Sequence, residues 1–187
     1  MIYEKNSFYH IYNRGCNREP IFLCENDYDL LISKIKETIS KSGINIIAYC
    51  LMPNHYHFLV QQLTDEPVSS WTKFLFNSYV QIINNRENRK GTLFEGKVQS
   101  RVISNNKYLI HIIQYIHYNP VAAKLVESPE DWKYSNYLEF IGKRKSSLFD
   151  EKFFFEHFQS FEEYENLMKD YQMNKEMIED YIFEEDD

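Results

Sequence analysis

The chain has 187 residues, 43% of them hydrophobic, and a formal net charge of −7. This length is enough for one domain with its own core and an extension. Its three cysteines, Cys16, Cys24 and Cys50, show no C-x-x-C spacing, which argues against a disulfide framework and a zinc ribbon. The sequence starts without a signal-peptide core, and no apolar run approaches the ~20 residues of a membrane span. We therefore expect a soluble, cytoplasmic protein.

Charge is distributed unevenly along the chain. Lys and Arg outnumber Asp and Glu by 14 to 10 in residues 1–126, whereas residues 127–187 carry 7 against 18. The segment between Trp71 and Lys107 has seven basic side chains and two acidic ones. Such a segment suits a phosphate backbone, although on charge alone a solvated helix face is the simpler interpretation.

Hydrophobic periodicity predicts an alternating order of strands and helices. In chain order we expect a strand at 6–14, a helix at 26–42, strands at 44–52 and 55–62, a helix at 71–89 capped by Ser69 or Ser70, a strand at 97–103, and a helix that starts at a capping Ser or Asn and stops at Pro120. The "PN" turn makes the middle strands an antiparallel hairpin.

This order predicts an α+β, ferredoxin-like fold, in which an antiparallel sheet carries two helices on one face. A third helix is added to that unit. The later part of the chain is aromatic and acidic, which favours two or three short helices packed on the domain. We accordingly expect a domain at 1–126 and an acidic helical extension at 127–187.

Two histidines stand out in the strand predicted at 55–62. His55 and His57 face the same side of that strand, while Tyr56 and Phe58 face the other. Imidazoles at this spacing lie about 6 to 7 Å apart along the backbone and can bind one ion. The alternatives are two histidines at a solvent-facing edge, or one core histidine bonded to a carbonyl group.

Two more polar residues share one face of the helix predicted to stop at Pro120. Tyr115 and Asn119 lie four residues apart, about one helical turn. An amide oxygen can serve as a further metal ligand, and a neighbouring tyrosine can act as a nucleophile toward a phosphate held on the ion. Tyr118 lies at another angle of the helix and is the alternative nucleophile.

Taken together, these motifs resemble those of a known family. "AYCLMPNHYHFLV", followed some sixty residues later by "YIHYNPVAAKLV", is similar to the HUH single-tyrosine transposases, and among them to the REP-associated tyrosine transposases. "GTLFEGK", "YHIYNRGCNREPIF" and "DWKYSNY" also match, so the resemblance covers roughly residues 8 to 140. Ala122 and Lys97 stand where the family commonly has arginine, and Thr92 where it often has histidine, differences that concern DNA affinity rather than chemistry.

The resemblance implies a metal-dependent enzyme. His55, His57 and Asn119 would hold Mg²⁺ or Mn²⁺, and Tyr115 would attack single-stranded DNA beside a hairpin, leaving a covalent 5′-phosphotyrosine and a free 3′-hydroxyl. Strands would then be cut and rejoined by transesterification. We expect Tyr12, Phe94 or Tyr118 to stack on unpaired bases. The expected phosphate-binding residues are Arg14, Lys73, Arg86, Arg89, Lys90, Lys97, Arg101 and Lys107.

Two other functions remain open at this point. One is a non-catalytic, regulatory protein that binds hairpin DNA and retains the transposase fold. The other is a metal-binding structural domain without a nucleic acid partner, which leaves the basic middle segment unexplained. Family members act as dimers or as monomers, and the sequence leaves both states open.

Overall fold

The computed structural model describes residues 3–173. Its elements are β1 (Phe8–Arg14), α1 (Glu25–Ser42), β2 (Ile44–Met52), β3 (His55–Gln62), α2 (Val68–Arg86), β4 (Gln99–Ile103), α3 (Asn106–Ala122), α4 (Tyr137–Phe140), α5 (Glu151–His157) and α6 (Phe161–Met173), with single 3-10 turns at Cys16–Arg18 and Pro129–Asp131. The four strands form one antiparallel sheet in the order β2-β3-β1-β4. The predicted α+β, ferredoxin-like architecture is thereby confirmed.

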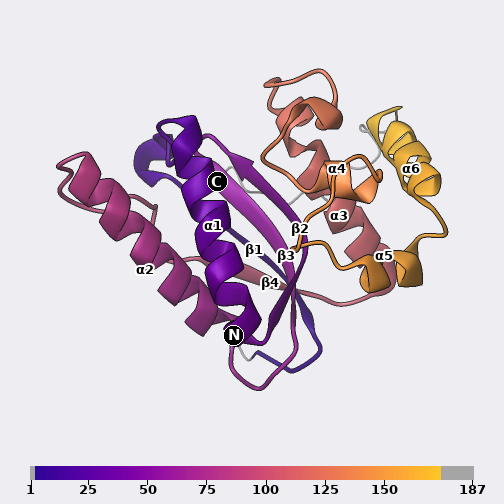
Figure 1. The fold of residues 1–187 in the computed structure, drawn as a ribbon, viewed down its shortest axis with the longest axis horizontal. Coiled ribbons are helices and arrows are strands. Elements are labelled where there is room, and N and C mark those ends of the chain that lie inside the picture. Colours follow the sequence, from indigo (N-terminus) through magenta and orange to yellow (C-terminus); the bar gives the residue numbers. More distant parts are fainter. Residues whose placement is uncertain (1–2, 174–187) are drawn as a thin grey trace.

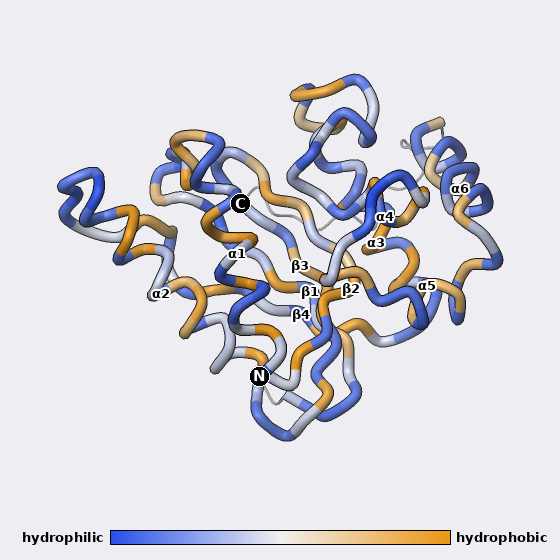
Figure 2. Tube along the Cα trace, viewed as in Figure 1, coloured by the Kyte–Doolittle hydropathy of each residue, from blue (hydrophilic) through white to orange (hydrophobic). Residues whose placement is uncertain are grey.

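The sheet separates two layers of helices. Helices α1 and α2 cover one face, while α3 and the short helices α4 to α6 lie toward the other (Figure 1). Figure 2 shows hydrophobic residues along β2 and hydrophilic residues at the outer end of α2. Within residues 3–173, no helix has the length and apolar character needed to cross a membrane.

Alternation along β3 directs its side chains into two different cores. Tyr56, Phe58 and Val60 join the core beneath α1 and α2. Leu59 joins the core beneath α3, and His57 lies on that same side of the strand. Because each face of the strand packs on a separate layer, β3 is buried along most of its length.

The edge strand β2 contains a bulge between Ile46 and Ala48. The extra residue shifts the alternation, so the neighbours Ile47 and Ala48 both belong to the α3 core, whereas Ile46 and Tyr49 belong to the α1–α2 core. Asn136 compensates for the disturbed ladder: its amide donates to the Ile47 carbonyl at 2.9 Å and accepts from Tyr49 N–H at 2.7 Å. Residues from the predicted extension therefore protect the exposed edge of the sheet.

Three predicted helix boundaries are wrong, one of them the end of α2, which lies at Arg86 and not at residue 89. Helix α3 does not stop at Pro120 but continues to Ala122, because a proline in the last turn removes only one helical hydrogen bond. Helix α2 begins at Val68 after Pro67, and no side chain caps it; neither Ser69 nor Ser70 has that role. At α3 the expected cap is present, since the Asn105 side chain accepts from Tyr108 N–H at 2.9 Å.

Candidate metal and tyrosine site

Three elements bring the predicted site residues together on the α3 side of the sheet. Strand β1 runs between β3 and β4, with Tyr12 opposite His57 and Arg14 opposite His55. Residues directly opposite each other in an antiparallel pair point to the same face. Tyr115 and Asn119 reach this face from α3, which packs across the sheet.

The amide of Asn119 lies between the two histidines. Its Oδ1 is 3.1 Å from His55 Nε2, and its Nδ2 is 3.4 Å from His57 Nε2. The imidazole rings themselves are 5.1 Å apart, centre to centre. No group of three or more His, Cys, Asp or Glu side chains suited to a metal occurs in residues 3–173, so a metal here would rely on two imidazoles and an amide oxygen, with its other positions open.

The protonation of His55 follows from its neighbours. Asn54 donates its amide Nδ2–H to the Arg18 carbonyl at 3.1 Å, which turns Asn54 Oδ1 toward His55 Nδ1 at 2.7 Å. His55 must therefore carry its proton on Nδ1, and its Nε2 presents a lone pair to the oxygen of Asn119. Two acceptors that face each other at 3.1 Å are stabilised by a cation or a proton between them, whereas without either a half-turn of the amide would let Nδ2–H donate to His55.

Burial keeps a proton from filling that role near neutral pH. Removal from water lowers the pKa of His55, with a smaller opposing contribution from the Asn119 contact, and lowers the pKa of His57 well below its usual value. Neutral imidazoles are the form that binds metals. The chemistry of these three side chains therefore fits a divalent cation held by His55, His57 and Asn119.

Tyr115 stands beside the histidines. Its half-buried ring lies 5.4 Å from the ring of His57 and 6.1 Å from that of His10, in edge-to-face geometry with both. Tyr118, the alternative nucleophile, is only 9% exposed and packs on Tyr171 of α6 at 5.5 Å. Of the two tyrosines, Tyr115 is therefore the one whose ring contacts His57.

His10 is a site residue that the sequence did not single out. It is fully buried on β1, and its Nε2 lies 3.0 Å from His57 Nδ1. Burial, with a smaller contribution from the Arg101 charge, lowers the pKa of His10 to about 3. Strand periodicity places His10 on one side of β1, but only the pairing of β1 with β3 brings it to His57.

Two predicted phosphate contacts flank this site. Arg14 lies opposite His55, and Arg101 of β4 lies opposite His10, so both belong to the site face of the sheet. Arg14 also forms an exposed ion pair with Glu95 at 2.5 Å. Lys107 is exposed in the first turn of α3.

The other predicted basic residues do not gather at the site. Lys73 is exposed on α2, in the opposite helix layer, while Arg89, Lys90 and Lys97 lie between α2 and β4. The interpretation of Arg86 as a DNA contact has to be corrected. Its two terminal nitrogens bond the fully buried carboxylate of Asp27 at 2.5 and 3.0 Å, and its Nε bonds Glu87 at 2.6 Å, which is a structural role.

Of the three aromatic residues expected to stack on bases, only Tyr12 has a suitable position. It is half-buried, and its ring lies 6.1 Å from that of His57. Phe94 packs in the α1–α2 core, 5.3 Å from the ring of Phe76. Phe94 and the buried Tyr118 therefore serve the cores, and the prediction that they stack on bases is wrong.

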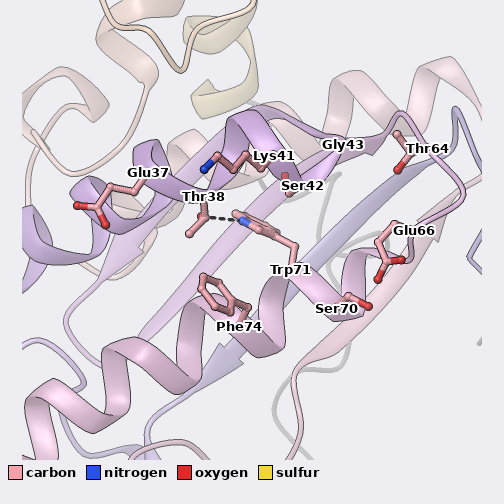
Figure 3. Close-up of a pocket in the computed structure, with 10 residues that line it drawn as sticks. All are labelled: Glu37, Thr38, Lys41, Ser42, Gly43, Thr64, Glu66, Ser70, Trp71 and Phe74. Carbon is pink, nitrogen blue, oxygen red and sulfur yellow. Dashed lines mark hydrogen bonds between the residues drawn. The ribbon is translucent and has the colours of Figure 1, made fainter.

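A separate hollow of about 530 Å³ lies between the end of α1 and the start of α2 (Figure 3). Its lining includes Trp71, whose indole donates to the hydroxyl of Thr38 at 3.1 Å, and the 65% exposed Phe74. None of the predicted catalytic or metal-binding residues lines it. The hollow belongs to the helix layer opposite the histidines.

Comparison with known proteins identifies the family of the chain. The family model described as "Transposase IS200 like" matches residues 4–119. A Haemophilus influenzae protein provisionally named a REP-associated tyrosine transposase is 27% identical over 115 residues, which are 56% of this chain and 65% of that protein. The chain thus matches slightly less than two thirds of this relative.

A solved structure is similar in fold. The structure, titled as a REP-associated tyrosine transposase bound to a REP hairpin, superposes with a TM-score of 0.66 over 80% of this chain and 92% of the other, at 20% identity. At this identity the similarity concerns the fold.

Proposed function

The chain belongs to the IS200-like transposase family, and on that premise we propose that it cuts and rejoins single-stranded DNA near hairpins through a covalent 5′-phosphotyrosine at Tyr115. One observation carries the proposal. His55 Nε2 and Asn119 Oδ1, two lone-pair donors, face each other at 3.1 Å within the site where Tyr115 lies against His57.

We propose Mn²⁺ or Mg²⁺ as the ion that His55, His57 and Asn119 hold. When bound, such an ion neutralises charge on the scissile phosphate and orients the phosphorus for attack. Magnesium prefers a shell of oxygen ligands, whereas imidazole is a donor for softer divalent ions. Two imidazoles in a three-residue donor set therefore favour Mn²⁺ over Mg²⁺.

In the reaction itself, the phenol oxygen of Tyr115 attacks the phosphorus in line with the leaving oxygen. The Oη–P bond forms as the P–O3′ bond breaks; the phenol loses its proton and the departing 3′-oxygen gains one. Energy of the phosphodiester is retained in the tyrosyl ester. The 3′-hydroxyl of another strand can then reverse the step and join that strand to the 5′ end without a nucleotide cofactor.

The position of the site between the sheet and α3 supports an unpaired substrate. The phosphate has to reach between the sheet and α3, where Tyr115 and the histidines lie, and a bent single strand can do so more easily than a duplex. Arg14 and Arg101 flank this position on the same face and would hold phosphates on either side. Tyr12 offers a ring for an adjacent base.

A hairpin beside the cleavage site is part of the proposal. The similar solved structure is described as bound to a REP hairpin, and the exposed basic residues outside the site, Lys90, Lys97 and Lys107, are available for a neighbouring duplex backbone.

The test is formation of a denaturation-resistant adduct. Protein and labelled hairpins with single-stranded flanks are incubated with Mn²⁺ or Mg²⁺ and separated on a denaturing gel. Wild type and Tyr118→Phe are expected to form the adduct, whereas Tyr115→Phe is expected to form none. Hairpin binding by wild type without an adduct in any of a broad library of flanks would favour the regulatory, non-catalytic function. An adduct that persists in Tyr115→Phe would show that another residue is the nucleophile.

A further inference from the structure

His10 is arranged differently from the structural histidine of the same core. His117, also fully buried, has both ring nitrogens bonded: Nδ1 lies 2.6 Å from the Tyr164 hydroxyl and Nε2 lies 2.9 Å from Asn136 Oδ1. His10 has a partner for Nε2 only, while its buried Nδ1 has no hydrogen-bond partner among residues 3–173. A buried polar atom left in this state is unfavourable for folding, so packing alone does not account for His10.

The contact between His10 and His57 allows either ring to donate, and the ligand role of His57 selects one of these two proton arrangements. For His57 to offer its Nε2 lone pair, the proton of the neutral ring must be on Nδ1. That Nδ1–H then points to His10 Nε2, 3.0 Å away, which must act as the acceptor. The proton of His10 consequently lies on its own Nδ1, the atom that has no partner.

Asn54 and His10 thus have equivalent relationships to the two proposed ligands. Asn54 Oδ1 accepts from His55 Nδ1, and His10 Nε2 stands at the corresponding place behind His57. The rings of His10 and His57 also lie side by side in nearly parallel planes, with centroids 5.2 Å apart and planes inclined by 20°. These contacts fix the orientation of the His57 ring as well as the position of its proton.

We propose that His10 is a positioning residue, which holds His57 in the Nδ1–H tautomer and turns its Nε2 toward Asn119 and the ion. This inference rests on the proposed function, because the ligand role of His57 is part of it. Partners of this kind behind a histidine ligand raise its basicity and restrict its orientation. His10 itself does not touch the substrate or the ion.

Two substitutions separate this role from packing. His10→Gln can keep an amide oxygen close to the position of Nε2, and so retains the acceptor. His10→Phe keeps a flat ring in the same core and removes the acceptor. The control is Tyr79→Phe, which removes a buried hydrogen bond of 2.7 Å to the Ile21 carbonyl on the opposite side of the sheet.

The first measurement needs neither metal nor DNA. Nitrogen-15 NMR of the imidazoles in the metal-free protein reports the proton position on His57. We expect the Nδ1–H tautomer in wild type and His10→Gln, and a mixture with Nε2–H in His10→Phe. A wild-type His57 protonated on Nε2, or an unchanged His57 tautomer in folded His10→Phe, would overturn the proposal. The wild-type spectrum decides this even if His10→Phe does not fold.

The second measurement is Mn²⁺ affinity by titration calorimetry. His10→Phe is expected to bind Mn²⁺ about 10- to 100-fold more weakly than wild type, with most of the affinity restored in His10→Gln and unchanged in Tyr79→Phe. Equal affinity in folded His10→Phe and wild type would contradict the positioning role. If wild type binds no divalent ion while its His57 has the expected tautomer, the metal in the proposed function fails and the proton arrangement stands.

Discussion

The imidazole of His117 on α3 and the amide of Asn136 meet at 2.9 Å in the buried core. Asn136 also bonds two backbone groups of β2, so this contact connects α3 to the edge strand of the sheet. Tyr115 and Asn119 lie on the same helix, two residues before and after His117. Asn136, which lies in the predicted extension, therefore helps to hold α3 in place against the sheet.

Replacing Asn136 by Leu is expected to lower the free energy of unfolding by about 3 kcal/mol, because His117 and two buried backbone groups lose their partner. Urea denaturation followed by circular dichroism measures this change. Asn85→Leu on the exposed side of α2 is the matched control and should alter stability by about 0.5 kcal/mol or less. Equal stability of Asn136→Leu and wild type would show that the amide does not stabilise the bulge.

Acid should destabilise the protein through His117. Burial lowers the pKa of His117 to about 4, below its usual value of 6.5. The unfolded chain therefore binds a proton between these values that the native protein does not. The contribution of His117 is complete above pH 6.5 and declines as pH falls toward 4, by about 3 kcal/mol in total.

Urea unfolding of wild type and His117→Gln between pH 7 and pH 4 checks this dependence. The substitution lowers stability at pH 7 but should reduce the slope of stability against pH. His10 and His57 have lowered pKa values for the same reason, so a smaller slope of the same sign should remain. An identical slope in the two proteins would mean that His117 binds protons equally in the native and the unfolded state.

Arg86 and Arg101 should affect different properties when each is changed to Gln: stability in the first case and DNA binding in the second. Arg86→Gln leaves the buried Asp27 without its ion-pair partner and is expected to lower the free energy of unfolding by about 2 kcal/mol. Arg101→Gln is expected to weaken single-stranded DNA binding and to reduce the salt dependence of log K by about 0.7 per lost phosphate contact.

Thermal unfolding and fluorescence anisotropy at several salt concentrations separate these two effects. Arg86→Gln should keep the wild-type salt dependence at a temperature where it is folded. A reduced salt slope for Arg86→Gln would instead indicate that its guanidinium leaves Asp27 to bind DNA.

Tyr12 should contribute affinity for unpaired DNA through its ring. Tyr12→Ala is expected to weaken binding of a single-stranded oligonucleotide by about 1 to 3 kcal/mol, whereas Tyr12→Phe should retain most of the affinity. Anisotropy titrations in EDTA exclude any effect on metal binding. If Tyr12→Phe weakened binding as strongly as Tyr12→Ala, the hydroxyl rather than the stacking surface would be the important group.

The periodicity of the sequence alone predicted the two pairs of residues that make up the candidate site. The two-residue repeat of a strand places His55 and His57 on one face, and the helical repeat places Tyr115 and Asn119 on one face. The same repeats predicted the order of strands and helices, and with it the antiparallel sheet. These features are local, since each depends on residues a few positions apart.

Tertiary structure decided what those faces meet. The order β2-β3-β1-β4 brings His10 to His57 and Arg101 to His10, and the packing of α3 turns the Asn119 amide toward both histidines. The same packing removed Arg86 and Phe94 from the predicted DNA-binding set, because Asp27 and the α1–α2 core hold them. Pairing between strands and helices distant in the sequence depends on how all the apolar faces are buried together, and no local repeat of residues encodes that arrangement.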